Sequence, residues 1–473
     1  MRLITNFKAK LIASVLALGM IGSLIVPVVT HAAVVNPAPT AKVSFAFDDS
    51  LASAYTKAAP TLAKYGLTGT SYAITGCVGM TKVPNTCHAN TDLPYMTWAQ
   101  LKALQTTYHW EIGSHTVDHP CLASNAKADP SDCQTNTLTK AQVDAELLNS
   151  KTALANHGIT ATAFAPPYGD YSNMVMAQIA KYYTSMRGFK EQGTNGWPLD
   201  DYLLNNITVQ QRLTPVATLE SKIDQAISSN SWVILSFHDI AAKPSQNPDD
   251  YQYGTAELAQ VAAYVQSKQA AGLIKNVNTS QGLVTSTTNM LPNGTFNDGV
   301  GDGWSTDDPI RITKDTASNG SYPDYTNSIK LVSNPNGKQT HLFSPAVSVN
   351  PNTTYLFKNF LNVQKISSGE VGFYVDEYDV NGSWISGQYL KRENSSFVED
   401  MNFAYKPTSL AVAKASLQVV MAGTGITAYL DNSQMFALST ATPTQINLLP
   451  NGNFNAGIAD GWSTDAAGNI VAD

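Results

Sequence analysis

Charged side chains are scarce in this chain. Asp, Glu, Lys and Arg make up only 14% of its 473 residues, whereas about a quarter is usual in soluble proteins. The net charge is −7 and no stretch gathers basic residues, which argues against nucleic acid and against an anionic polymer held by charge. A neutral or weakly charged glycan suits such a surface better, and 21 tyrosines and 7 tryptophans supply rings that can stack on sugar faces.

Long apolar runs are also missing, except at the N-terminus. There, basic residues precede an apolar run over 11–29, and Thr30-His31-Ala32 forms an acceptable cleavage site. We therefore predict a secretory signal peptide over 1–32, removed by cleavage, and a linker over 33–41. Retention of the run as a membrane anchor is the alternative. Once cleaved, the chain is expected to be secreted, either extracellular or associated with the cell wall, and not to bind membranes.

Cysteine is rare as well, with four residues that all fall between positions 77 and 133. No Cys-x-x-Cys pair occurs, so a zinc site built from thiolates is disfavoured. In an exported protein these thiols are expected to be oxidised. Of the three possible pairings, the spacing favours Cys77–Cys87 and Cys121–Cys133. Each of these short loops would add about 2–3 kcal/mol to the stability.

Two pairs of residues in the sequence are typical of metal sites. Asp48 and Asp49 follow the apolar run 43–47, which predicts a buried strand. His115 and His119 are four residues apart, and on a helical turn positions i and i+4 share a face. Together they predict a catalytic metal site with three ligands and one carboxylate left over as a base. Taken alone, the aspartates could instead cap a helix or a turn, and the histidines could lie on the surface.

Two further segments extend this pattern. Residues 232–237 predict a buried strand that leads into His238, and 164–169 predict a short strand stopped by a rigid turn. The ordered segments resemble the motifs of the NodB-like polysaccharide deacetylases of carbohydrate esterase family 4. The segments that carry the resemblance are Phe47-Asp48-Asp49-Ser50, His115-Thr116-Val117-Asp118-His119, Pro167-Tyr168-Gly169 and Leu235-Ser236-Phe237-His238. The resemblance implies an α/β fold, a distorted (β/α)7 barrel, over residues 42–285.

The resemblance also assigns roles to residues of this chain. It implies that Asp49, His115 and His119 bind one divalent metal. Zn²⁺ suits mixed nitrogen and oxygen ligands best, with Co²⁺ or Ni²⁺ as alternatives. Asp48 would act as the general base toward the attacking water, and His238 as the general acid toward the leaving group.

A second group of roles concerns the substrate pocket. The resemblance implies that the backbone N–H of Tyr168 stabilises the oxyanion. It also implies that Leu235 helps to line the pocket for the acetyl methyl group, with Pro167 close to the substrate. These three residues complete the site that the family pattern predicts.

Two features depart from the family pattern. The arginine that pairs with the catalytic base in the family falls at Ala165 here. Arg187, which ends the next strand-like stretch, could supply the missing guanidinium from a neighbouring strand, or it could be an ordinary surface arginine. The family's fourth motif, Asp-x-x-Asp-Trp, is absent. Trp197 is the nearest candidate for its tryptophan in the substrate pocket, although an ordinary loop explains that segment better.

Beyond residue 285 the helical periodicity ends. After a polar linker over 286–289, short alternating stretches between Gly, Asn and Pro turns predict an all-β sandwich over 290–438. Its opening and the segment 428–432 resemble carbohydrate-binding modules of the jelly-roll type. Candidate sugar-stacking residues in the sandwich, each with core packing as the alternative, are Trp304, Tyr322, Tyr325, Trp384 and Tyr389.

The last residues repeat the start of this sandwich. After a linker over 439–446, residues 447–465 match 289–307 at 14 of 19 positions. Because residues 447–473 are too few for a second sandwich, we expect them to be the truncated start of one.

Taken together, the sequence predicts a secreted, metal-dependent hydrolase that acts as a monomer. Its expected substrate is an N-acetylated, GlcNAc-containing polysaccharide of a cell wall or an exopolysaccharide, from which it removes acetyl groups. One alternative is a catalytically inactive barrel that serves as a glycan-binding adhesin. The other is an O-acetyl xylan esterase.

Overall fold

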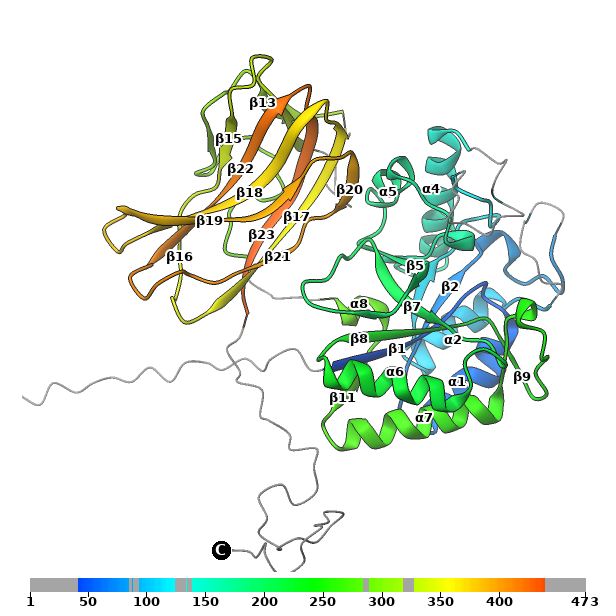
Figure 1. Ribbon diagram of the computed structural model, residues 1–473. Coiled ribbons are helices and arrows are strands. Elements are labelled where there is room, and N and C mark those ends of the chain that lie inside the picture. The colour runs from blue at the N-terminus through cyan, green and yellow to red at the C-terminus, as the bar shows by residue number, and fades with distance from the viewer. Residues whose placement is uncertain are drawn as a thin grey trace, which may run out of the picture. The chain divides into compact units, whose positions relative to one another are not determined.

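The computed structural model of this chain, drawn in Figure 1, describes residues 41–84, 87, 93–123, 133, 138–283, 289–317 and 327–438. The predicted signal peptide, most of the linker over 286–289 and everything beyond residue 438 lie outside the described residues. Within the described ranges, no helix is both long and apolar enough to cross a bilayer.

Parallel strands in the first part of the chain close into a barrel. Their order is β1, β2, β3, β4, β5, β7 and β8, and β1 pairs with β8 to complete the ring. Every neighbouring pair around it is parallel, which confirms the predicted distorted (β/α)7 barrel. The strands are Ala41–Phe47 (β1), Thr70–Ala73 (β2), Glu111–Ser114 (β3), Ala163–Phe164 (β4), Ser185–Gln192 (β5), Leu204–Thr208 (β7) and Trp232–Phe237 (β8).

Short strands extend the barrel at its edges. One of them, β11, runs parallel to β1, and another, β6, runs antiparallel to β8. A separate two-stranded sheet, β9 with β10, follows β8 and returns the chain toward it. These strands are Thr194–Asn195 (β6), Asp239–Ala241 (β9), Gln252–Gly254 (β10) and Ile274–Asn276 (β11).

Helices connect the barrel strands, and α1, α6 and α7 are seen outside the β1 and β8 side in Figure 1. Two of the longer helices begin at capping boxes, Thr97 with Gln100 and Thr139 with Gln142, a signature that fixes a helix start. The helices are Ala59–Ala63 (α1), Trp98–Thr107 (α2), Lys140–Asn156 (α4), Asn173–Ile179 (α5), Val216–Ser228 (α6), Thr255–Ala270 (α7) and Thr279–Gly282 (α8). Shorter turns are Ala54–Ala58 (η1), Thr75–Cys77 (η2), Pro167–Gly169 (η3) and Pro248–Asp250 (η4).

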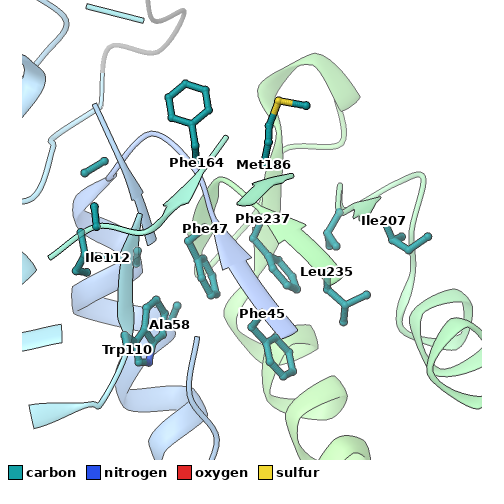
Figure 2. Packing of buried hydrophobic residues seen from close by; sticks show 14 of the residues in the cluster. Phe45, Phe47, Ala58, Trp110, Ile112, Phe164, Met186, Ile207, Leu235 and Phe237 are labelled. Atoms are coloured by element: carbon teal, nitrogen blue, oxygen red, sulfur yellow. The ribbon is translucent and has the colours of Figure 1, made fainter. Parts of the chain in front are cut away.

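The strand β1 is buried on both faces, as its nearly continuous apolar sequence predicts. Phe45 and Phe47 stack on Phe237 of β8, with ring centroids 6.1 Å and 5.2 Å apart, and Figure 2 shows these rings on one side of the paired strands. On the other face, Ala46 joins a smaller apolar cluster with Trp232 and other residues. The strand ends of the barrel are therefore held in a packed, rigid frame.

Both predicted disulfides are present. Cys77 bonds to Cys87 and Cys121 bonds to Cys133. The second bridge begins two residues after His119, so it restrains the chain directly after this histidine.

The second part of the chain is a sandwich of two antiparallel sheets, as predicted from its alternating pattern. One sheet has the order β12-β15-β22-β18-β19 with β16 on β22, and the other has β13-β14-β23-β17-β20 with β21 on β17. Apolar side chains from both sheets form one core. The strands are Ser305–Thr306 (β12), Ile312–Asp315 (β13), Ser328–Val332 (β14), Thr340–Phe343 (β15), Val347–Ser348 (β16), Thr354–Lys365 (β17), Ser368–Tyr378 (β18), Trp384–Glu393 (β19), Phe397–Asp400 (β20), Phe403–Tyr405 (β21), Lys414–Thr424 (β22) and Thr427–Leu438 (β23).

The candidate sugar-stacking residues of the sandwich fall into different environments. Trp304 is buried in the core and its indole N–H donates to the Pro292 carbonyl at 2.8 Å, so the surface role is wrong for it. Trp384 is 60% exposed, and Tyr389 is partly exposed. Tyr322 and Tyr325 lie outside the described residues.

Candidate active site

Polar residues gather where the barrel strands end. Asp48 and Asp49 directly follow β1, His115 directly follows β3 and His238 directly follows β8. The carboxyl ends of parallel strands meet at one end of a barrel, so side chains from distant parts of the sequence converge there. The backbone N–H of Asp48 also donates to the Phe237 carbonyl at 2.9 Å, which ties this residue to β8.

Asp49, His115 and His119 converge on one point. Asp49 Oδ1 lies 3.4 Å from Nε2 of each histidine, and the ligand atoms of the three residues lie within 4.8 Å of one another. Two imidazole nitrogens and one carboxylate oxygen form a ligand set that suits a catalytic zinc ion with open positions. The residues present therefore fit a divalent metal.

The histidine pair comes from a loop, so the helical turn expected between its two residues is wrong. Residues 115–120 form no helix. Instead, Thr116 (φ 70°) and His119 (φ 57°) have left-handed backbone, and the Thr116 hydroxyl accepts a hydrogen bond from the His119 N–H at 3.0 Å. Asp49 is also left-handed, with φ 67°. Such conformations cost about 1–3 kcal/mol each and concentrate at functional sites.

Hydrogen bonding and burial prepare both imidazoles to bind a cation. His115 Nδ1 lies 2.7 Å from the Ala165 carbonyl oxygen, which can only accept, so Nδ1 carries the proton and Nε2 offers its lone pair. Burial lowers the pKa of His119 to about 3, against the opposing charge of Asp49, so this ring is neutral. Burial alone would raise the pKa of Asp49, but the His115 hydrogen bond and the neighbouring imidazoles hold it well below its ordinary value.

Arg187 supplies the cation beside Asp48 that the alanine at position 165 cannot supply. Its Nη2 lies 2.7 Å from both carboxylate oxygens of Asp48, and both side chains are only 1% exposed. The guanidinium also lies 5.1 Å from the centre of the Tyr72 ring, and Nη1 donates to the Gly188 carbonyl at 2.9 Å. The contact expected from the neighbouring strand is present, and a surface position for this arginine is excluded.

His238 faces the same carboxylate from β8. Its Nε2 lies 3.9 Å from Asp48 Oδ2, and its side chain is 14% exposed. The residues that the resemblance assigns as acid and base therefore lie close to each other at the same end of the barrel.

The turn that carries Tyr168 lies beside the histidines. The Tyr168 ring centroid is 4.6 Å from that of His119, and its φ is 58°. The same side chain packs on the Cys121–Cys133 disulfide, while Pro167 is buried within the turn. This position is compatible with the expected oxyanion role of the Tyr168 N–H, which stays a prediction.

Two residues expected in the substrate pocket lie elsewhere. Leu235 is fully buried in the apolar cluster that contains Phe45 and the helix α7 residues. Successive strand residues face opposite sides, so Leu235 points away from the side that His238 takes three residues later. Trp197 lies 5.4 Å from Nζ of Lys42, near the start of β1, whereas the aspartates follow its end. Both expectations are therefore wrong.

Two aromatic residues beside His238 were not predicted from the sequence. The Tyr251 ring lies 4.9 Å from the imidazole and the Phe189 ring lies 5.8 Å from it, measured between centroids. Neither belongs to a recognisable motif, and an isolated aromatic residue is usually part of a core. Only the folded chain brings them to the site.

The N-terminal part of the chain matches a known family. Residues 36–185 match the family described as Polysaccharide deacetylase. This segment, which includes β1 to β4, therefore has the sequence pattern of a polysaccharide deacetylase domain. The matched range includes Asp48, Asp49, His115 and His119, whereas Arg187 lies just beyond its end. No curated protein sequence matches the chain.

Solved structures of other proteins are similar to parts of this chain. A family 4 carbohydrate esterase from Streptomyces lividans in complex with acetate is 19% identical over 53% of this chain and 100% of its own, with a TM-score of 0.32. A Streptococcus pyogenes deacetylase in complex with acetate is 22% identical over 38% of this chain and 69% of its own, with a TM-score of 0.30. A family 16 carbohydrate-binding module is 20% identical over 31% of this chain and 99% of its own, with a TM-score of 0.25. The similarity of residues 36–185 to the polysaccharide deacetylases rests on the sequence match.

Proposed function

We propose that this chain is a secreted, metal-dependent N-deacetylase of a GlcNAc-containing polysaccharide. The observation that carries the proposal is the cluster at the strand ends, where three metal-ligand residues adjoin a buried Asp48–Arg187 pair. Asp48 is held by the Arg187 guanidinium next to the metal-ligand residues, and His238 lies close to it. Such an arrangement is suited to hydrolysis of an acetyl group.

The residues of this chain divide the chemistry between them. Asp49, His115 and His119 would hold the metal, which when bound acidifies a water molecule and polarises the acetyl carbonyl. Asp48 accepts a proton from the attacking water, while Arg187 keeps its carboxylate in place. The water oxygen bonds to the acetyl carbon, the carbon–nitrogen bond breaks, and His238 donates a proton to the departing amine. The products are acetate and a free amino sugar.

Arg187 gives the buried carboxylate of Asp48 a charged partner. Because Asp48 is almost fully buried, an isolated carboxylate there would be strongly disfavoured. The guanidinium contacts both carboxylate oxygens of Asp48, and such a charge-assisted contact holds a carboxylate in one orientation. The carboxylate that we propose as the base is thus fixed in place directly next to Asp49.

The sandwich is proposed to hold the polymer near the enzyme. Tyr374 of β18 pairs across strands with Tyr389 of β19, and Tyr378 pairs with Trp384. Side chains of directly paired residues lie on the same face of a sheet, so four aromatic side chains share one face. The rings of Tyr374 and Tyr389 lie over glycines, because a Cβ at Gly387 or Gly372 would be 2.1 Å or 2.3 Å from their hydroxyls. Flat, partly exposed rings are suited to stacking on sugars.

The proposal is tested by measuring acetate release from four polymers side by side: chitooligosaccharides, poly-N-acetylglucosamine, peptidoglycan and acetylxylan. We expect release from at least one N-acetylated polymer, abolished by a chelator and restored by Zn²⁺ or Co²⁺. Release from acetylxylan alone would make the protein an O-acetyl esterase. No release from any polymer by metal-loaded protein would favour a glycan-binding protein with an inactive barrel.

A further inference from the structure

The proposed acid, His238, lacks the hydrogen bond that normally orients a catalytic histidine. Its Nδ1 is buried, and among the described residues it has no hydrogen-bond partner. The adjacent Asp239 directs a carboxylate oxygen to Gln252, whose Nε2 donates to it at 3.0 Å. Imidazoles that transfer protons are usually fixed through the second ring nitrogen. Something else must therefore set the orientation of this ring.

Two aromatic rings take up the space around the imidazole. Phe189 meets it edge to face, with centroids 5.8 Å apart and planes at 89°. Tyr251 is closer, at 4.9 Å and 51°, and the two aromatic rings are themselves 6.0 Å apart. Rings in tilted and edge-to-face contact attract through their charge distributions and prefer a defined orientation. The imidazole thus sits in a three-ring cluster.

Phe189 is held firmly by its surroundings. It lies in β5, two residues after Arg187, and packs against the turn that carries Tyr168. A Cβ added to Gly169 would lie 2.8 Å from the Phe189 Cβ, so the backbone of that turn contacts Phe189 directly. The φ of Gly169 is 65°, a conformation that glycine adopts without strain.

Tyr251 is fixed by its backbone and by the next strand. Its φ of 47° and ψ of 34° are left-handed, and its N–H donates to the Pro248 carbonyl at 3.1 Å. Gln210 Nε2 donates to the same carbonyl at 2.8 Å. Directly afterwards, Gln252 pairs with Asp239 in the β9–β10 ladder. The chain on both sides of this tyrosine is therefore anchored next to His238.

We propose that Tyr251 and Phe189 are positioning residues for His238, holding its ring so that Nε2 faces Asp48. This inference rests on the proposed function, in which His238 protonates the leaving amine. The aromatic pair replaces the missing hydrogen bond at Nδ1 with contacts to the faces and edges of the ring. The hydroxyl of Tyr251 is not required for this role, whereas the ring is.

The test compares Tyr251→Phe, Tyr251→Ala and Phe189→Leu on the polymer that gives the highest acetate release. Because a misplacement of about 1 Å can lower a rate about 100-fold, we expect kcat to fall about 10- to 100-fold in Tyr251→Ala and Phe189→Leu. KM and zinc content should stay within about twofold. Tyr251→Phe should keep kcat within about threefold of the wild type. Tyr264→Ala is the matched control, since Tyr264 is a partly buried tyrosine paired with Asp224 on the helices.

Three kinetic results would overturn the inference. An unchanged kcat in Tyr251→Ala and Phe189→Leu would show that the rings do not position the acid. A rise in KM alone would make them substrate contacts, and a loss in Tyr251→Phe as large as in Tyr251→Ala would assign the role to the hydroxyl.

A measurement without turnover separates this inference from the proposed function. The ring signals of His238 are followed by NMR in ¹⁵N-histidine-labelled wild type and Tyr251→Ala. We expect a single sharp set in the wild type and broadened or shifted signals in the variant, whether or not the protein releases acetate. Identical signals in both would reject the inference, whereas failure of the proposed function would appear only as an inactive wild type.

Discussion

At the scale of single residues, the proposed site depends on the guanidinium of Arg187, which contacts the buried carboxylate of Asp48. The family resemblance predicts an arginine beside the base at position 165, where this chain has Ala165, and Arg187 on the neighbouring strand contacts Asp48 instead. The two positions are neighbours, because Ala165 directly follows β4, Arg187 lies in β5, and these two strands are paired side by side. Meanwhile the Ala165 carbonyl orients His115, a role that needs no particular side chain.

Replacement of Arg187 should therefore remove both activity and stability. In Arg187→Ala, Asp48 would remain buried without its cation, and breaking a buried pair in this way costs about 3–5 kcal/mol. We expect kcat to fall at least about 100-fold, measured as acetate release at saturating polymer, and urea unfolding to shift to lower concentration. Arg311→Ala, which breaks a partly exposed pair with Asp308 in the sandwich, should change neither.

The double variant Ala165→Arg/Arg187→Ala tests whether the place of the cation matters. If only the charge next to Asp48 counts, an arginine at the family position should recover part of the lost rate. Full activity in Arg187→Ala alone would contradict the assigned role.

At the scale of elements, the start of β1 contains a mostly buried lysine, Lys42, whose charge destabilises the fold. Burial, with a smaller contribution from Lys275, lowers the pKa of Lys42 from 10.5 to about 8. Its Nζ donates to the Gly282 carbonyl of α8 at 2.7 Å. Between these two pKa values the unfolded chain binds more protons than the folded chain, so stability rises with pH in that window. Below pH 8 the buried, charged lysine lowers the stability of the folded state.

The difference in unfolding free energy between Lys42→Met and wild type should therefore depend on pH. We expect the difference to favour the variant by about 1–2 kcal/mol more at pH 7 than at pH 10.5, allowing for the partial exposure of Lys42. Urea unfolding of both proteins at pH 7, 8.5 and 10.5 measures this difference. A difference that stays constant over this range would show that the lysine keeps its ordinary pKa in the fold.

Much of the element order could be predicted because strong local signals agreed with the fold. The apolar run before Asp48, the capped helix α4 and the alternation of strands and helices all favour a barrel. The loop geometry of His115 and His119 could not be predicted, since left-handed residues other than glycine are stabilised by their surroundings. The i, i+4 spacing indicated the correct pair of histidines, but it predicted a helical turn where the chain forms a loop.

The candidate site was predictable only where residues belong to a pattern. Leu235 was misplaced because a strand's alternation, not its motif, decides which face a side chain takes. Tyr251 and Phe189 were missed because they reach His238 only through the folding of separate loops and strands.

At the scale of the whole molecule, a barrel with the candidate active site and a sandwich with an aromatic face occur in one chain. The two parts would act together if the sandwich keeps the polymer close to the barrel. On this account, polymer binding and acetate release are separable properties.

The variant Trp384→Ala should separate them. Trp384 is exposed and its indole N–H donates to Asp376 at 2.9 Å, so the ring is held in place on the surface. We expect retention on insoluble polymer to weaken about 10-fold, a loss of about 1.4 kcal/mol, while kcat on short soluble oligosaccharides is unchanged. Leu410→Ala, a substitution of another exposed apolar residue of the sandwich, serves as the control. Equal retention of wild type and Trp384→Ala would remove this face from glycan binding.

The central claim is that Asp49, His115 and His119 hold a metal while the adjacent Asp48 performs the proton transfer. It is tested most directly by measuring zinc binding and acetate release together in wild type and Asp48→Asn. We predict that both bind one Zn²⁺ with similar affinity by calorimetry, and that the variant's acetate release falls at least about 1000-fold, since it has lost its base. Asp48→Asn that binds zinc and still releases acetate at the wild-type rate would contradict the account.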